Sequence, residues 1–269
     1  MPRRIIITSI LLLLVGNCLA STILETTGSA RSLGMGGNGI VNSRNVTDWL
    51  ANPAGLTETL NNQIGTSYAN MFLEDIGYTF LGGVIPLKAK NLSLAAAYRQ
   101  IKTDLDYDLT YSEAATTIGV GFALPYGISL GMALNTIKVQ SEFWGNGYSL
   151  DLGVIKNIKQ GQFGLCIENI YSRLDYTTGL STHLEPKYNL GIAYYPQNET
   201  SLRLGIENFM YLSLGMEYDL TETMKLRIGM NEKGFTGGAG LALGPWILDY
   251  ALFNNGLELE HRLATIFQL

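Results

Sequence analysis

Residues 201–207 read SLRLGIE, and this stretch decides the fold because its apolar and polar side chains alternate. Its three aliphatic residues share one face, whereas Arg203 and Glu207 share the other. The same period of two recurs along the chain, at residues 148–154, 212–218, 226–230 and 257–269. Sustained alternation is typical of a β-strand with two different faces, and it does not suit a helix.

Turn signals rich in Gly, Pro and Asn separate these runs and divide residues 62–269 into fourteen predicted strands. The predicted strands are 62–72, 76–86, 92–103, 113–125, 128–142, 146–157, 161–171, 187–195, 200–208, 211–219, 223–231, 234–243, 246–253 and 257–269. Bacterial outer-membrane barrels have an even number of strands, each of about 9–11 residues. Aromatic residues also recur near the strand ends, as in interface girdles: Tyr68, Tyr126, Trp144, Tyr171, Tyr188, Tyr195, Tyr211 and Trp246.

The sequence therefore predicts an all-β fold, a transmembrane antiparallel up-and-down β-barrel of about fourteen strands over residues 62–269. A soluble β-sandwich is the alternative, because its strands also alternate. With the N-terminus in the periplasm, the two longest loops, 104–112 and 172–186, lie outside the cell. The short turns at 126–127 and 244–245 then lie inside, which is the expected asymmetry.

The amino-acid composition limits the classes of function that this chain can have. Charged residues make up 15% of the 269 residues, against about 25% in typical soluble domains. The chain has 31 Gly and 15 Tyr but only 2 His and 2 Cys, which argues against a disulfide scaffold, a disordered chain and a zinc-cluster protein. The formal net charge is −5, and without a basic stripe we expect no nucleic-acid partner.

Residues 1–20 have the layout of a secretory signal peptide. An arginine pair precedes the mostly apolar residues 5–15, and Ala20 is the small residue at the expected cleavage site. The apolar run is too short to span about 30 Å of hydrocarbon as a helix. We therefore expect cleavage after Ala20 and export to the outer membrane of a Gram-negative bacterium, with lipidation of Cys18 as the alternative.

Residues 21–61 do not alternate, and they are interpreted as an N-terminal periplasmic or luminal hatch. Residues 45–51 are expected to form one or two helical turns that end at Asn52, because proline disfavours helix at the preceding residue. The candidate hatch residues are Arg31, Gly34, Gly36, Gly37, Asn52 and Pro53. The glycines permit close passage along the barrel wall, and Pro53 is expected to set the bend into the first strand.

The polar phase of the strands places charged side chains on the inner wall. They are Arg203, Glu207, Glu217, Lys225, Arg227, Asp249, Glu258, Glu260 and Arg262, joined by Arg99, Asp151 and Glu168 from earlier strands. Mixed signs predict cross-strand pairs, for example Arg203 or Arg227 with Glu217. Because acidic residues outnumber basic ones in this set, we also expect Arg31 to pair with a wall carboxylate. These charges either neutralise a narrow interior or form a polar constriction that filters solutes.

Two motifs invite other functions. Gly34, Gly36 and Gly39 have the spacing of a dinucleotide fingerprint, but the strand, helix and βαβ unit that this motif needs are missing, so we expect no cofactor. No cluster of metal ligands is recognisable, and we expect no metal. His183 lies near Ser181 in a loop and His261 lies on the last strand, yet neither has a recognisable hydrolase motif around it. We therefore expect no catalytic residues and no enzymatic activity.

The glycine-dense stretch carries a family resemblance. Residues 30–37 read ARSLGMGG and residues 52–56 read NPAGL, and together they resemble the start of mature PorV/PorQ-type outer-membrane proteins. That family is more remotely similar to the long-chain fatty-acid transporter barrels. The resemblance implies a fourteen-stranded barrel with an N-terminal hatch.

Two roles follow from the resemblance, namely transport of hydrophobic small molecules or service in a type IX-like secretion pathway. The partners it implies are outer-membrane lipid and either a hydrophobic small molecule or secretion-system proteins. An outer-membrane barrel hydrolase and a purely structural outer-membrane protein are the alternatives.

Overall fold

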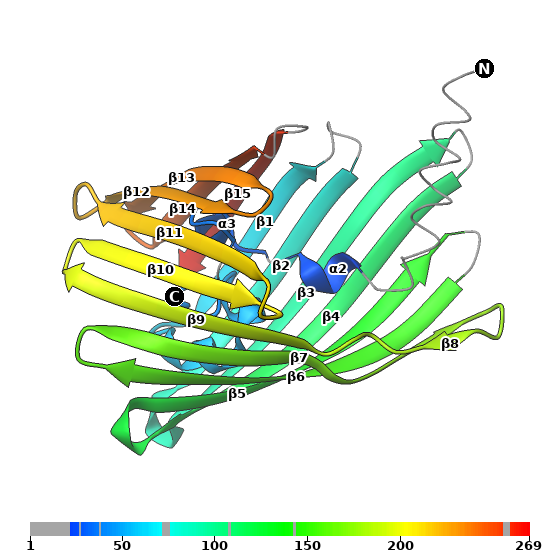
Figure 1. Cartoon of the computed structure of the whole chain (residues 1–269), viewed down its shortest axis with the longest axis horizontal. Coiled ribbons are helices and arrows are strands. Elements are labelled where there is room, and N and C mark those ends of the chain that lie inside the picture. The colour runs from blue at the N-terminus through cyan, green and yellow to red at the C-terminus, as the bar shows by residue number, and fades with distance from the viewer. Residues whose placement is uncertain are drawn as a thin grey trace.

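The computed structural model describes residues 22–26, 28–37, 39–71, 76–106, 109–141, 144–254 and 259–269. The predicted signal peptide, residues 1–20, lies outside these ranges. The strands form one sheet in which sequential neighbours pair antiparallel. β1 pairs with β15 and β6 pairs with β7, so the sheet closes on itself (Figure 1). No helix in the described ranges is long and apolar enough to cross a membrane.

Fourteen strands make up the wall, which confirms the predicted barrel. They are β1 (Gln63–Met71), β2 (Ile76–Leu87), β3 (Leu92–Asp106), β4 (Leu109–Leu124), β5 (Ile128–Gln140), β6 (Trp144–Ile158), β7 (Gly161–Tyr176), β9 (Lys187–Gln197), β10 (Thr200–Glu207), β11 (Tyr211–Asp219), β12 (Met224–Asn231), β13 (Gly234–Leu243), β14 (Trp246–Asn254) and β15 (Leu259–Gln268). The two-residue strand β8 (Ser181–Thr182) pairs with the end of β7. Short 3-10 turns η3 (Lys88–Lys90) and η4 (Pro125–Gly127) join β2 to β3 and β4 to β5.

The alternation predicted from sequence appears as alternating burial along the strands, for example in β5. The exposed phase is the apolar one. Ile118 is 63% exposed and Leu263 is 53% exposed, whereas the neighbouring inward-facing residues are buried. A soluble β-sandwich buries its apolar phase, so this inverted pattern favours the membrane barrel over that alternative.

The wall is taller on one side than on the other. β3 to β7, here called the tall side, have 13–16 residues each, whereas β10 to β15, the short side, have 8–10. Figure 1 shows β3–β7 reaching farther to the right than β9–β12. The predicted loops 104–112 and 172–186 are therefore wrong in extent, because strand pairing continues along β3 and β4 and reaches the end of β7. Polar residues on the outward face had hidden these extensions from the apolar pattern.

The chain before β1 is called the N-terminal segment, meaning the described residues from 22 to 61. It contains the short helices α2 (Thr22–Glu25) and α3 (Ala30–Leu33) and the 3-10 helices η1 (Trp49–Ala51) and η2 (Pro53–Glu58). α3 contacts β13 to β15, and η2 contacts β2 to β6. The expected role of Pro53 in the bend into β1 is wrong, because Asn52 caps η2 and Pro53 is its first residue, a position that proline favours.

Candidate functional site

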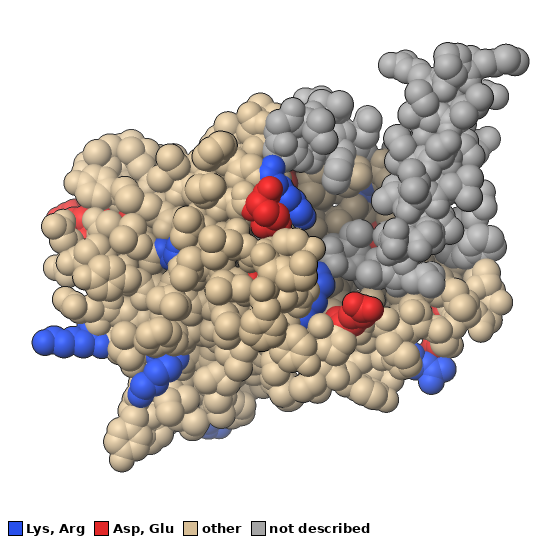
Figure 2. Space-filling view, viewed as in Figure 1, with Lys and Arg blue, Asp and Glu red and all other residues tan. Residues whose placement is uncertain are grey.

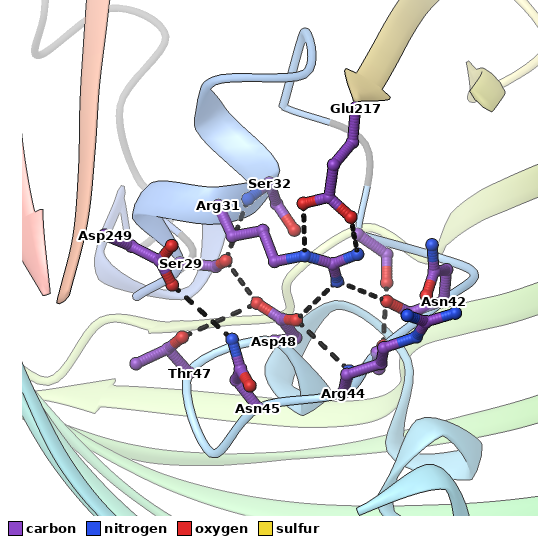
Figure 3. Close-up of polar contacts among 12 residues, drawn as sticks. Ser29, Arg31, Ser32, Asn42, Arg44, Asn45, Thr47, Asp48, Glu217 and Asp249 are labelled. Atoms are coloured by element: carbon purple, nitrogen blue, oxygen red, sulfur yellow. Dashed lines mark hydrogen bonds and ion pairs between the residues drawn. The ribbon is translucent and has the colours of Figure 1, made fainter. Parts of the chain in front are cut away.

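Arg31 joins the N-terminal segment to the short side of the barrel (Figure 3). Its Nε and Nη2 atoms donate to the two carboxylate oxygens of Glu217 over 2.9 and 2.7 Å. Its Nη1 atom donates to Asp48 over 3.1 Å and to the Asn42 carbonyl over 2.6 Å. A two-pronged arginine–carboxylate contact is strong and directional. The predicted pairing of Arg31 with a wall carboxylate is thus present.

Arg31 is 3% exposed, so its charge depends on its neighbours. Burial alone lowers the pKa of the guanidinium, but the charge and hydrogen bonds of Glu217, together with the charges of Asp48 and Asp249, raise this pKa overall. The cation is therefore permanent, and a buried cation that loses its partner is strongly destabilised. Loss of the Glu217 carboxylate would therefore destabilise the docked position of α3.

The ion pairs continue across the short side. Glu217 and Arg227 face each other on β11 and β12, and Arg227 Nε donates to Glu217 over 2.7 Å. Arg227 Nη1 lies 2.7 Å from Asp249 Oδ1 on β14. Of the two predicted pairs with Glu217, the structure shows the one with Arg227. Arg203 instead donates from Nη2 to the Asn42 carbonyl over 3.1 Å, so it too contacts the N-terminal segment.

Asp48 links two parts of the N-terminal segment to each other. The Ser29 hydroxyl accepts a hydrogen bond from the Ser32 amide over 2.9 Å, which caps α3, and it donates to Asp48. Asp48 also accepts the backbone amide of Arg44 over 3.2 Å. Sequence reasoning missed Asp48, although a signal was available, because it is the only acidic residue between residues 26 and 57.

Glycines of the wall lie where the N-terminal segment comes closest. A Cβ atom at Gly153 would lie 1.9 Å from Asn52 Oδ1, and one at Gly131 would lie 2.0 Å from the Ala54 amide nitrogen. A Cβ atom at Gly229 would likewise meet the turn after α3 at 2.3 Å. Sequence reasoning did not single out these wall glycines, because a glycine in a strand pattern does not reveal what lies opposite it.

The predicted hatch glycines differ among themselves. Gly36 has a φ of +82°, and a Cβ atom there would lie 2.6 Å from the Leu214 carbonyl oxygen, so both conformation and space require glycine. Gly34 lies against Gly238, with 3.2 Å between an added Cβ and the Gly238 Cα. Gly37 also has a positive φ, +87°, but it is exposed, and a Cβ atom there would lie 3.8 Å from the side-chain nitrogen of Asn231, which is an ordinary contact.

Several of the remaining predicted wall charges also meet charges of opposite sign. These pairs are Lys225 with Asp219 over 2.5 Å, Arg262 with Glu260 over 2.7 Å and Glu207 with Lys187 over 3.9 Å. Glu258 lies outside the described residues. Opposite charges therefore neutralise one another on the short side, and the choice between neutralisation and a solute-filtering constriction stays a prediction.

A polar belt crosses the inner face of the tall side. Arg99 on β3 donates from Nη2 to Thr117 and Asn135 over 3.0 and 3.1 Å, and Asn135 donates to Asp151 over 2.7 Å. Arg99 is 3% exposed, and among the described residues its Nε–H has no hydrogen-bond partner. Glu168 continues the belt, accepting a hydrogen bond from Asn189 over 2.8 Å.

Two cavities open at the two ends of the barrel. The turn-side vestibule, of about 710 Å³, is lined by Arg31, Arg44 and Glu58 of the N-terminal segment and by wall residues such as Lys225 and Asp249. The second cavity, of about 170 Å³, lies at the opposite end and is called the outer pocket because the topology predicted from sequence places that end outside the cell. It is lined by residues such as Leu24, Gly37, Leu50, Arg99 and Glu168. The N-terminal segment contributes to both cavities, so it lies between them.

Above the polar belt, the inner face of the tall side is mostly apolar, although the buried carboxylate of Glu113 also lies there and accepts the Ile23 amide over 2.7 Å. This apolar inner wall consists of Ile101, Ile137, Val139 and Leu174, together with Tyr78 of the adjacent strand β2, and these residues form one cluster with Ile23 of α2. The outward face of the same strand ends is polar and includes Lys102, Lys138, Arg173 and Asp175. The tall side thus has its apolar residues inside and its polar residues outside at this level, the reverse of its membrane-facing part.

Glu58 lies at the edge of the vestibule, and its carboxylate accepts a hydrogen bond from Gln162. Gln162 also accepts the Asn42 amide over 2.7 Å, so it connects Glu58 to the loop that holds Arg31. Burial raises the pKa of Glu58 to about 7, although the Gln162 hydrogen bond and the nearby Arg44 charge oppose this shift. Glu58 therefore changes its charge near neutral pH.

The histidines do not make a nucleophile–base pair in the described structure. His183 Nδ1 lies 2.5 Å from the Ser172 carbonyl, whereas the Ser181 hydroxyl donates to Asp175 over 2.5 Å. His261 lies on the outward face of β15, where its Nδ1 contacts the Tyr250 hydroxyl over 2.6 Å. A serine hydrolase needs its histidine within hydrogen-bond distance of the nucleophilic serine hydroxyl.

No family model and no curated protein sequence matches this chain. Solved barrels do match in structure. The Pseudomonas putida toluene transporter TodX aligns with a TM-score of 0.68 and 11% identity over 90% of this chain and 97% of its own. The CymD monoaromatic hydrocarbon channel aligns with 0.66 and 12% identity over 91% and 98%. A Pseudomonas aeruginosa FadL homologue aligns with 0.68 and 10% identity over 90% and 98%.

These likenesses show the fold, since the identities are low. The expected remote likeness to long-chain fatty-acid transporter barrels is confirmed at that level. TodX is named as a transporter, CymD as a channel and the third protein as a FadL homologue, and none of these names is that of an enzyme. The resemblance to PorV/PorQ-type proteins stays a prediction. This chain has the fold of FadL-type transporter barrels.

Proposed function

We propose that this chain is a non-enzymatic barrel of the bacterial outer membrane that passes hydrophobic small molecules toward the periplasm. The observation that carries the proposal is the apolar inner wall of the tall side, which lies above the membrane-facing band and beside the outer pocket. An aqueous pore for polar solutes would have no need of buried Ile101, Ile137 and Leu174 on its inner face.

The route begins at the apolar inner wall and continues into the outer pocket. There Arg99 offers a buried guanidinium whose Nε–H lacks a partner among the described residues, so a polar group on an otherwise apolar ligand can bind it. TodX is a toluene transporter, and CymD is a monoaromatic hydrocarbon channel. This supports the ligand class proposed here.

The N-terminal segment serves as the hatch of this route. In this proposal the described residues between 22 and 61 separate the outer pocket from the turn-side vestibule, and Arg31, Gly34, Gly36, Gly37, Asn52 and Pro53 position the segment against the wall. The domain plan is a signal peptide over residues 1–20, the hatch, and the barrel over residues 62–269. A ligand passes when the hatch shifts away from the vestibule.

Uptake of a fluorescent hydrophobic probe into proteoliposomes tests the proposal. Ile137→Gln places a polar group on the apolar inner wall, and we expect it to lower the uptake rate several-fold. Thr136→Gln is the matched control, because Thr136 is the outward-facing neighbour on the same strand. Uptake by the wild type no faster than by empty liposomes would show that the chain does not carry hydrophobic molecules.

A secretion-associated role is the second candidate. It rests on the resemblance of residues 30–37 and 52–56 to PorV/PorQ-type proteins, and the exposed outer rim of the short side offers a surface for a protein partner, with Phe209 67% and Met210 77% exposed. Cross-linking from Met210 in cells would identify such a partner. Failure to capture a secretion protein, together with active probe uptake, favours transport.

A further inference from the structure

An apolar groove of about 400 Å³ runs along the outer face of β6, β7, β9 and β10. It is lined by Val154, Phe163, Leu165 and Ile192 among others. These residues point away from the lumen, because the intervening wall glycines face the N-terminal segment. An added Cβ at Gly164, for example, would meet that segment at 2.7 Å. The groove therefore faces the lipid of the membrane.

Lys156 closes the groove at its turn end. Among the described residues it is the only charged one that lines the groove, and it shares the outward face of β6 with Val154. Its Nζ donates to the carbonyl oxygen of Tyr126 in η4, which holds the ammonium at the level of the short turns. The Tyr126 side chain is 89% exposed beside it, as aromatic residues are at a membrane interface.

A charge at this position is exceptional in the wall. Among the described strand residues, the other outward-facing charged side chains are Lys102, Lys138, Arg173 and Asp175, and all four lie at the outer ends of the tall side. Lys156 alone lies in the turn-side half, at the edge of the apolar band. Figure 2 shows Lys and Arg side chains projecting at the left end, where the short turns lie. A lysine placed there keeps its stem in lipid and its ammonium at the headgroups.

We propose that this groove and Lys156 form a binding site for one anionic phospholipid of the inner leaflet. One acyl chain lies in the groove over the backbone of the paired residues Gly164 and Gly191, and the phosphate contacts the Lys156 ammonium. Charge complementarity selects an anionic headgroup, and the apolar lining selects an acyl chain. The inference rests on the proposed outer-membrane location but not on transport.

Native mass spectrometry of the full barrel in detergent, with added phosphatidylglycerol, tests the site. We expect one retained phosphatidylglycerol on the wild type and at least tenfold weaker retention on Lys156→Gln. Lys138→Gln is the matched control, because it removes an outward-facing lysine at the other end of the wall, and it should retain lipid like the wild type. Leu165→Trp fills the groove with Lys156 intact and should also weaken retention.

Two further arms separate the parts of the ligand. Glycerol phosphate, which has the headgroup but no acyl chain, should not displace the lipid, and phosphatidylcholine should be retained less than phosphatidylglycerol. Equal retention by Lys156→Gln and the wild type, or an equal loss in Lys138→Gln, would overturn the site. The readout is bound lipid rather than probe uptake, so a failure of the transport proposal would be seen separately.

Discussion

The two sides of the barrel present opposite chemistry to the lumen. The short side carries Glu217, Arg227 and Asp249 in one chain of ion pairs that holds α3 through Arg31. The tall side carries the polar belt at the level of the membrane and the apolar inner wall above it. Strand length accompanies this difference, since the strands of the tall side have 13–16 residues and those of the short side 8–10.

This difference indicates that the short side anchors the N-terminal segment, whereas the tall side offers the path for a ligand. Ion pairs between buried groups are directional, so the short side holds the N-terminal segment in one position and orientation. Apolar contacts have no such direction, so the tall side can accept ligands of varied shape. A barrel lined uniformly with either kind of residue would lack one of these properties.

Removing the N-terminal segment should have the largest effect. Deletion of residues 28–56 leaves all wall strands in place, so we expect the barrel to insert and its conductance in planar bilayers to rise from near zero to a steady open level. Heat-modifiable migration of the deleted protein serves as the control for insertion. If that protein inserts and its conductance stays unchanged, the segment does not close the lumen.

Glu217→Gln breaks the anchor on the short side. It leaves the buried cations Arg31 and Arg227 with one carboxylate fewer, which costs about 3–5 kcal/mol in comparable buried pairs. We expect the segment to detach part of the time, which limited proteolysis near α3 would detect as faster cleavage. Asp175→Asn removes the carboxylate of the exposed pair with Arg173 and should leave the cleavage rate unchanged.

Gly153→Val tests the contact between the tall side and η2. The new side chain would collide with Asn52, whose Oδ1 lies 1.9 Å from the position of an added Cβ. Overpacking of this kind costs about 1–3 kcal/mol, and we expect a lower thermal unfolding temperature. Gly237→Val faces outward with its nearest contact at 3.9 Å, and it should keep the wild-type temperature. Equal shifts in both variants would contradict the close approach.

A change in pH should have a smaller effect on how firmly the N-terminal segment is docked. The pKa of Glu58 is raised to about 7, so the docked segment binds this proton more tightly than a free chain does. The resulting stabilisation is complete below the ordinary Glu pKa and is lost as the pH rises through 7. We expect faster proteolysis of the segment at pH 8 than at pH 5.5. Glu58→Gln should remove this difference, and a pH response that persists in the variant would assign it to another group.

Particular elements show how far sequence reasoning reached. Fourteen strands, their order and the inward face of Arg203, Arg227 and Asp249 followed from the period of two, because strand faces alternate wherever the backbone is extended. The ends of β3, β4 and β7 could not be predicted from this period. Their outward residues become polar where the wall extends beyond the apolar band. A search for alternating apolar residues therefore does not detect these strand ends.

Some residues of the candidate site could be predicted from the sequence, and others could not. Arg31 could be expected to meet a carboxylate because it is a cation placed among acidic wall residues, yet the choice of Glu217 joins residues 186 positions apart. Asn42 and Gln162 were not identified, because a single amide side chain has no distinctive spacing in the sequence. Asp48 was also missed, although it is the only acidic residue between residues 26 and 57. Their importance comes from contacts with Arg31 and Glu58 that only the folded chain brings together.

The sequence by itself determined that the chain alternates over residues 62–269, that the alternating runs number fourteen and which side chains share a face. These are local properties of an extended backbone. Only the tertiary structure decided that the wall is tall on one side, that Gly131 and Gly153 meet η2, and that Lys156 ends an apolar groove. Closure of the sheet places residues of distant strands at one level, and no period within a single strand encodes that level.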